Sequence, residues 1–243
     1  MKWMTAFLAA AGLAAPAWAE DGDWRYRATL YGWFPAMDTA IETRFGTIEQ
    51  NASSADVLNA LDGVFMATFS AQNGNWGLVG DFLYADLGAS VPTPLPLFDS
   101  ATIGVELTAV SGYALYRISQ SGPVQFDIGA GFRHFNLGVD AGLTRGSSVP
   151  RSQSISDSWT DPLIAARLMV PLDERWFLTG FADFGGSGAD NQTWQAYGGL
   201  GYNFNDAWSM QVGWRHMDLT HRLEGRDVNI GLSGGLVGVT YSF

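Results

Sequence analysis

His134, His216 and His221 are the only histidines in the sequence, so they are the first candidates for chemistry. Asp218 lies between two of them, and a carboxylate that orients an imidazole is typical of metal sites and of hydrolytic pairs. With no cysteine in the chain, no thiolate is available to bind a metal. On the strand alternation described below, His134 and His216 fall on the outward face at the height of a membrane interface, where amphipathic rings are favoured. We therefore expect no catalytic residue, no metal and no cofactor.

Charged residues at alternating positions are the second chemical feature. In segments where one face is apolar, Arg and Asp side chains fall almost wholly on the other face, as in the inside of a barrel whose outside meets lipid. An Arg at mid-depth on the lipid face would cost about 2–4 kcal/mol. We expect a lumen-facing charged network. Its expected members are Arg25, Arg27, Asp81, Glu106, Asp127, Arg133, Asp161, Arg167, Asp183 and Arg215.

The alternating runs that carry these charges predict an all-β fold. They are roughly nine to eleven residues or longer, which is the length that a tilted membrane-spanning strand needs. Together they predict an antiparallel up-and-down transmembrane β-barrel of about ten strands, with eight or twelve as alternatives. The segment 35–61 is less regular, and we expect a long extracellular excursion there, with a hairpin at 40–50 and one or two helical turns capped by Ser53 or Ser54.

Connections between the runs alternate between short and long. Short polar turns are expected near residues 72–75, 120–123, 171–175 and 203–206, and longer loops at 89–102, 139–158 and 219–229. This asymmetry is typical of the periplasmic and extracellular ends of an outer-membrane barrel. Tryptophan directly follows three of the short turns, and indole favours a membrane interface. The expected interface girdle comprises Trp24, Trp76, Trp176, Trp208, Tyr241 and Phe243.

The two ends of the sequence predict export. Residues 1–19 have a positive start at Lys2, a short apolar run and an Ala-x-Ala site at Ala17–Ala19, which together are typical of a cleaved signal peptide. Residues 20–243 then form a single barrel domain. The last seven residues alternate and end on Phe243, as expected for a final strand that pairs with the first to close the ring.

The overall composition excludes some classes of binding partner. The formal net charge is −11, and every basic residue after Lys2 is Arg. This acidity argues against nucleic acid as a partner and against adhesion to anionic headgroups through a basic surface. Thirty glycines, many aromatic residues and only 15% charged residues suit a barrel wall.

Three segments resemble a poorly characterised group of proteobacterial outer-membrane β-barrel proteins, of the OmpA/porin-like kind. They are Trp159–Arg167 (WTDPLIAAR), Trp194–Tyr202 (WQAYGGLGY) and Gly213–Asp218 (GWRHMD). The resemblance implies an exported barrel in the outer membrane, and a C-terminal strand read by the barrel-assembly machinery. It implies no substrate and no catalytic residues.

The function expected from these observations is that of a monomeric outer-membrane barrel, with outer-membrane lipid as its surroundings. Its interior charges predict either a structural ion-pair network that fills a narrow barrel or a small passive channel. Two alternatives remain: an enzyme at the rim that acts on lipid or peptide, and a surface adhesin or receptor that uses the long loops.

Overall fold

The structure is a computed structural model that describes residues 24–43, 46–92, 100–119, 122–144, 151–188, 191–223 and 226–243. The expected signal peptide, residues 1–19, lies outside these ranges. Among the described residues, no helix is long and apolar enough to cross a membrane.

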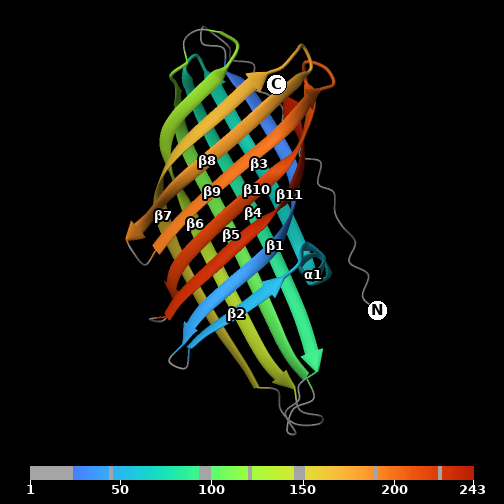
Figure 1. The fold of residues 1–243 in the computed structure, drawn as a ribbon, viewed down its shortest axis with the longest axis vertical. Helices are drawn as coiled ribbons and strands as arrows, with labels where there is room; N and C mark the ends of the chain where they lie inside the picture. Colours follow the sequence, from blue (N-terminus) through green and yellow to red (C-terminus); the bar gives the residue numbers. More distant parts are fainter. Residues whose placement is uncertain are drawn as a thin grey trace.

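Ten strands form a closed antiparallel ring, in the order β1, β3 to β11 and back to β1, which confirms the ten-strand barrel predicted from the sequence (Figure 1). One further strand, β2, pairs with β1 outside the ring. The elements of the described residues are β1 (Arg25–Thr43), β2 (Gly46–Ala52), α1 (Ser54–Asn59), β3 (Leu61–Asn73), β4 (Trp76–Pro92), β5 (Ser100–Arg117), β6 (Gln125–Thr144), β7 (Arg151–Pro171), β8 (Trp176–Gly188), β9 (Asn191–Asn203), β10 (Trp208–Leu223) and β11 (Arg226–Ser242).

Closure of the ring depends on the C-terminal strand. β11 pairs with β1 from Arg27 opposite Ser242 to Ile41 opposite Val228. Beyond this ladder, the backbones of Tyr26 and Phe243 exchange two hydrogen bonds of 2.9 and 3.0 Å. The last residue of the chain is therefore part of the sheet, and the ring has no open edge between its first and last strands.

The short turns gather at the end of the barrel where the C-terminus lies, which we call the short-turn rim (Figure 1). In two of these turns, the side chain of an Asp or Asn accepts hydrogen bonds from backbone N–H groups at the start of the next strand, including that of a tryptophan. Asp173 accepts from Arg175 and Trp176 at 2.7 Å each, and Asn205 accepts from Trp208 at 2.8 Å. These N–H donors hold the pKa of the Asp173 carboxyl below its usual range. This turn chemistry fixes the backbone where the next strand begins, at Trp176 in β8 and Trp208 in β10.

The opposite end, the long-loop rim, differs from the prediction. The described residues of the three connections expected as long loops are strand, because paired residues continue to Pro92–Ser100, Leu143–Arg151 and Leu223–Arg226. β1 likewise continues through Thr43 into the expected excursion. Beyond the bilayer both faces of a strand meet water, so the apolar alternation that marks a strand in sequence disappears there. Serines alternate with other residues over 152–158 for this reason.

The hairpin of β1 and β2 and the helix α1 lie beside the ring at the first strand (Figure 1). Ser53 caps the helix: its hydroxyl accepts from the backbone N–H of Asp56, whose carboxylate accepts in return from the Ser53 N–H at 3.0 Å. The ladder between β1 and β3 ends at Leu30 opposite Ala67. Closer to the long-loop rim, from Met37 opposite Ala52 onward, β1 pairs with β2 instead.

Candidate functional site

Strand alternation separates an outward apolar face from an inward polar one. On β4, Leu78 and Phe82 are exposed on the outside, while Asp81 and Leu83 point inward. The same two-residue period holds on β6, where Phe132 is outward and Arg133 is fully buried inside. The inside of the barrel is therefore the place where polar side chains can meet across strands that are far apart in sequence.

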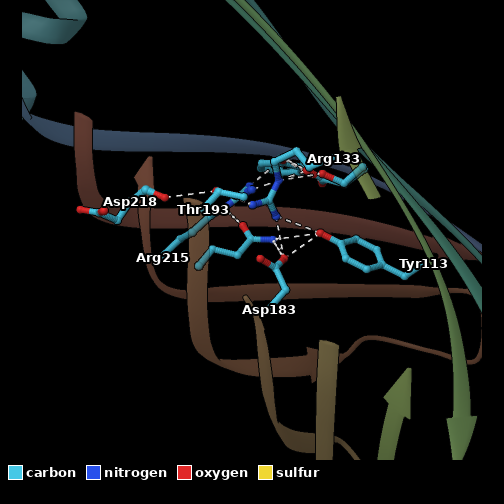
Figure 2. Close-up of polar contacts among 10 residues, drawn as sticks. Tyr113, Arg133, Asp183, Thr193, Arg215 and Asp218 are labelled. Atoms are coloured by element: carbon cyan, nitrogen blue, oxygen red, sulfur yellow. Dashed lines mark hydrogen bonds and ion pairs between the residues drawn. The ribbon is translucent and has the colours of Figure 1, made fainter. Parts of the chain in front are cut away.

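Arg133 is the centre of a buried polar network at mid-height (Figure 2). Its guanidinium donates to the hydroxyls of Ser111 and Thr193 at 3.0 Å each, and to that of Tyr113 at 2.9 Å. It also forms an ion pair with Asp183 at 2.6 Å, and neither side chain of this pair is exposed. Side chains from three other strands, β5, β8 and β9, thus satisfy one cation that has no contact with solvent.

Arg215 occupies the neighbouring part of the same network. Its Nε donates to the side-chain oxygen of Gln195 at 2.9 Å, and an Nη donates to the Tyr31 hydroxyl at 3.0 Å. Its second Nη lies 3.6 Å from Asp81, and its guanidinium lies 4.8 Å from the centre of the Trp33 ring. Because the amide nitrogen of Gln195 donates to Asp183, the two arginines belong to one connected set of hydrogen bonds. We call this set, built around Arg133 and Arg215, the central network.

An apolar layer lies directly on the long-loop side of the central network. On most strands the next inward residue after a network member is hydrophobic: Phe135 follows Arg133, Met217 follows Arg215, and Leu83 follows Asp81. Phe135 has no exposed surface, and Leu83 is 3% exposed. The members of this apolar layer are Trp33, Met66, Leu83, Ala109, Phe135, Met217, Leu219 and Leu236. The polar and apolar layers together fill the middle of the barrel.

Beyond the apolar layer, toward the long-loop rim, His221 stacks on Trp159 with ring centres 3.6 Å apart and planes 7° apart. The Nε2 of His221 lies 3.0 Å from the carboxylate of Asp157. Trp159 in turn donates to Asp161, which also accepts from Ser187 at 3.0 Å. This group extends the filled interior.

The three histidines are not brought together. His134 contacts Thr160 at 2.9 Å and His216 packs against Trp194, and both lie on outward positions of their strands, opposite in direction to His221. No group of three or more potential metal-binding side chains occurs among the described residues. Gly231–Gly235 matches the Gly-x-Ser-x-Gly pattern, but it lies inside β11, without the strand–turn–helix bend that would expose a nucleophile.

On the other side of the central network, a cavity of about 820 Å³ opens at the short-turn rim. Residues at its mouth come from two of the short turns, including Glu174, Arg175 and Asp206. Its inner end is formed by members of the central network such as Tyr31 and Arg215. We call this cavity the vestibule. Its volume falls in the range of small-molecule sites.

Nine of the ten predicted lumen residues lie inside the barrel. Asp81, Arg133, Asp183 and Arg215 belong to the central network, and Asp161 lies beyond the apolar layer. The other four line or adjoin the vestibule: Arg25, Arg27, Asp127 and Arg167.

The prediction for Glu106 is wrong. Its side chain is exposed on the outer surface, while its neighbour Leu107 packs inward against the apolar layer. It pairs with Asp86 on one side and Gly138 on the other, beyond the outward apolar stretch of β6 that ends near Phe132. An outward carboxylate is costly only within the hydrocarbon, so a charge at this height carries no information about the direction of the strand.

The wrong direction for Glu106 also hides two inward residues of β5 from a prediction based on the sequence. Taking it as inward places Tyr113 and Arg117 outward, whereas both are inside: Tyr113 in the central network, and Arg117 in an ion pair with Asp127 at 2.8 Å. The signal that reveals the correct direction is Tyr116, which lies opposite Trp76 in the sheet and packs edge-on against it. A girdle aromatic next to a short turn must face outward, so Arg117 must face inward.

The six predicted girdle residues all lie exposed at the short-turn rim. They contact other aromatic residues there: Trp76 packs on Tyr116, Trp176 on Tyr202, and Trp208 on Tyr241. Phe243 stacks on Tyr241 and on Tyr26, so the aromatic contacts run across the seam where the ring closes.

Comparison with solved structures identifies the same architecture. The outer membrane protease OmpT from Escherichia coli superimposes with a TM-score of 0.63 at 9% identity, over 92% of this chain and 97% of that one. The attachment invasion locus protein Ail of Yersinia pestis gives 0.39 at 11% identity, over 92% of this chain and 100% of its own. Neisserial surface protein A gives 0.34 at 14%, over 92% and 100%.

No protein-family model and no curated protein sequence matches the chain. At 9% identity, the superposition on OmpT shows the fold alone. The closed ten-strand ring, its outward apolar face and this superposition lead to one conclusion: the chain has the fold of an outer-membrane β-barrel protein.

Proposed function

We propose that this protein is a structural β-barrel of the outer membrane whose lumen is closed at mid-height. Of the two roles expected from the sequence, an interior that fills the barrel is favoured over a passive channel. The observation that carries this proposal is the pair of stacked layers: a central network with a fully buried ion pair of Arg133 and Asp183, and an apolar layer containing Phe135.

An ion that crossed the lumen would have to displace apolar side chains and a buried ion pair. Water-filled channels keep a continuous polar path, whereas here the polar layer is followed directly by Trp33, Phe135 and Met217. Opening a path would need these apolar side chains to leave their contacts, and would expose the buried ion pair of Arg133 and Asp183. Both steps cost free energy that a passive pore does not spend.

Insertion and location form part of the proposal. An N-terminal signal peptide over residues 1–19 would direct export, and β11, ending in Phe243, would be read by the barrel-assembly machinery. The long ladder between β1 and β11 supports a monomer, because it closes the ring within one chain. Heat-dependent gel mobility and a need for detergent are the expected properties of the purified protein. Solubility without detergent and a mobility unaffected by heating would contradict membrane insertion.

Solute release from vesicles tests the closed lumen. Vesicles that contain the wild-type protein should retain a small entrapped sugar, while the double variant Phe135→Ala with Met217→Ala should release it, because both changes shorten side chains of the apolar layer. Glu106→Gln is the control, since this residue is on the outer surface. Rapid release through the wild-type protein would contradict the proposal.

The rim enzyme and the adhesin have less support. His221 faces inward while the other two histidines face outward, and the described residues of the expected loop 139–158 are strand, in β6 and β7. Replacing His221 by Gln tests the enzyme most directly, because His221 alone of the three contacts a carboxylate.

A further inference from the structure

The vestibule contains an unusual concentration of positive charge. Four arginines line one small recess at its side, although the chain as a whole carries a net charge of −11. They come from strands β1, β5 and β7. β1 and β7 lie on opposite sides of the ring, so the four side chains meet across the lumen. We call these four the arginine cluster: Arg25, Arg27, Arg117 and Arg167.

Among the described residues, one carboxylate forms ion pairs with the cluster, and it reaches two of the four arginines. Asp127 accepts from Arg117 at 2.8 Å and from Arg167 at 2.6 Å, and it is almost completely buried between them. The described residues provide no hydrogen bond or ion pair to the guanidinium of Arg25 or Arg27. Arg27 instead faces the positive charges of Arg25, Arg117 and Arg167. The acids at the vestibule mouth, Glu174 and Asp206, do not line the recess.

The recess itself has the size of a small polyatomic group. Its volume is about 40 Å³, more than a single water requires, and it shares Arg27, Ser70 and Arg167 with the wall of the vestibule. A ligand could therefore place one charged group in the recess and the rest of its body in the vestibule. Arg25 and Arg27 would each offer up to five N–H donors to that group.

We propose that the arginine cluster is a binding site for the oxyanion group of a small organic ligand, a phosphate or a carboxylate, that enters from the short-turn rim. The planar guanidinium matches both groups through paired hydrogen bonds. Like charges held together without a counter-charge destabilise a fold, and a bound anion removes that cost. The site lies on the short-turn side of the central network, so it does not depend on whether the lumen conducts.

Calorimetric titration of the detergent-solubilised protein with pyrophosphate, and separately with citrate, tests this proposal and distinguishes the two anion chemistries. The wild type should bind at least one of them saturably, with one ligand per chain, and more weakly as NaCl is raised. Arg27→Gln should weaken binding about ten-fold, and the double variant Arg25→Gln with Arg27→Gln more strongly still. The charge-matched control is Arg222→Gln, an exposed residue at the other end of the barrel, which should bind as the wild type does.

A second measurement keeps the proposal testable if a variant binds poorly for structural reasons. The bound anion should raise the unfolding temperature of the wild type and of Arg222→Gln, but not that of Arg27→Gln, which should itself be folded. No saturable binding of either anion with a Kd below about 1 mM would overturn the proposal. An equal loss of binding in Arg222→Gln and Arg27→Gln would also overturn it, since the attraction would then be general and not local.

Discussion

The central network and the arginine cluster are two groups of arginines in one lumen, and their surroundings differ. In the central network, Arg133 and Arg215 donate to hydroxyl, amide and carboxylate oxygens from several strands. In the arginine cluster, Arg117 and Arg167 share the single carboxylate of Asp127, and no carboxylate of the described residues forms an ion pair with Arg27. A satisfied network holds strands together, whereas an unsatisfied cluster leaves donors free for a ligand.

We therefore expect the central network to contribute to the stability of the barrel and the arginine cluster to contribute to ligand binding. Substitutions in the central network should affect unfolding strongly and have no direct effect on ligands, because it contributes only the inner end of the vestibule. Substitutions of Arg25 or Arg27 should do the opposite.

Asp183→Asn should lower the free energy of unfolding by about 3–5 kcal/mol, because it leaves the buried charge of Arg133 without its counter-charge. Denaturant unfolding of the protein in detergent, followed by tryptophan fluorescence, measures the change. If this variant were as stable as the wild type, the ion pair would not contribute to the fold, and the contrast with the arginine cluster would be lost.

Leu83→Ala should cost about 2–5 kcal/mol, because it opens a cavity in the apolar layer. The matched control is Leu78→Ala on the same strand, since Leu78 is 50% exposed on the outward face and Leu83 is 3% exposed on the inward face. The same unfolding experiment compares the two. Equal losses would mean that the inner face of β4 is no better packed than the outer one.

Arg27→Gln should leave stability within about 0.5 kcal/mol of the wild type, and on the stabilising side, because it removes a charge that faces three other arginines and has no ion pair among the described residues. The measurement is again unfolding in detergent, without added anion. A loss as large as that of Asp183→Asn would show that Arg27 has a structural role similar to that of Arg133.

Asp173→Asn should have the smallest effect, and the effect should depend on pH. The folded-state pKa of Asp173 is lowered by the N–H groups of Trp176 and Arg175, so its stabilising contribution is present above the ordinary carboxyl pKa of about 3.9 and is lost as pH falls through the lower, folded-state pKa. The unfolding temperatures of variant and wild type should therefore differ at pH 7 and converge in strong acid. A difference that stays constant over this pH range would assign the effect to something other than the ionised carboxylate.

The sequence was sufficient to predict the barrel, its ten strands and the inward direction of most charges, because the bilayer penalises outward charge over the whole width of the hydrocarbon. This rule does not apply to Glu106, because outside the hydrocarbon an outward carboxylate costs little. Taking Glu106 as inward therefore predicts the wrong inward face for β5. The extended hairpins of β6 and β7 were missed for the same reason, since both of their faces meet water beyond the membrane.

The sequence alone does not predict which inward side chains contact one another within the lumen. Arg133 and Asp183 are fifty residues apart, and they meet because β6 and β8 flank β7 in the sheet and both side chains point inward. Neutral members such as Thr193 and Gln195 carry no charge that would mark them in the sequence. Alternation assigns a residue to the inside but does not give its height relative to residues on distant strands.

The most direct test of a closed lumen is the conductance of the wild-type protein in a planar lipid bilayer. The stacked central network and apolar layer predict that inserted protein, verified by its heat-dependent gel mobility, carries no steady current at moderate voltage in salt solution. A stable open conductance in the wild type, present without any substitution of Phe135 or Met217, would contradict the account.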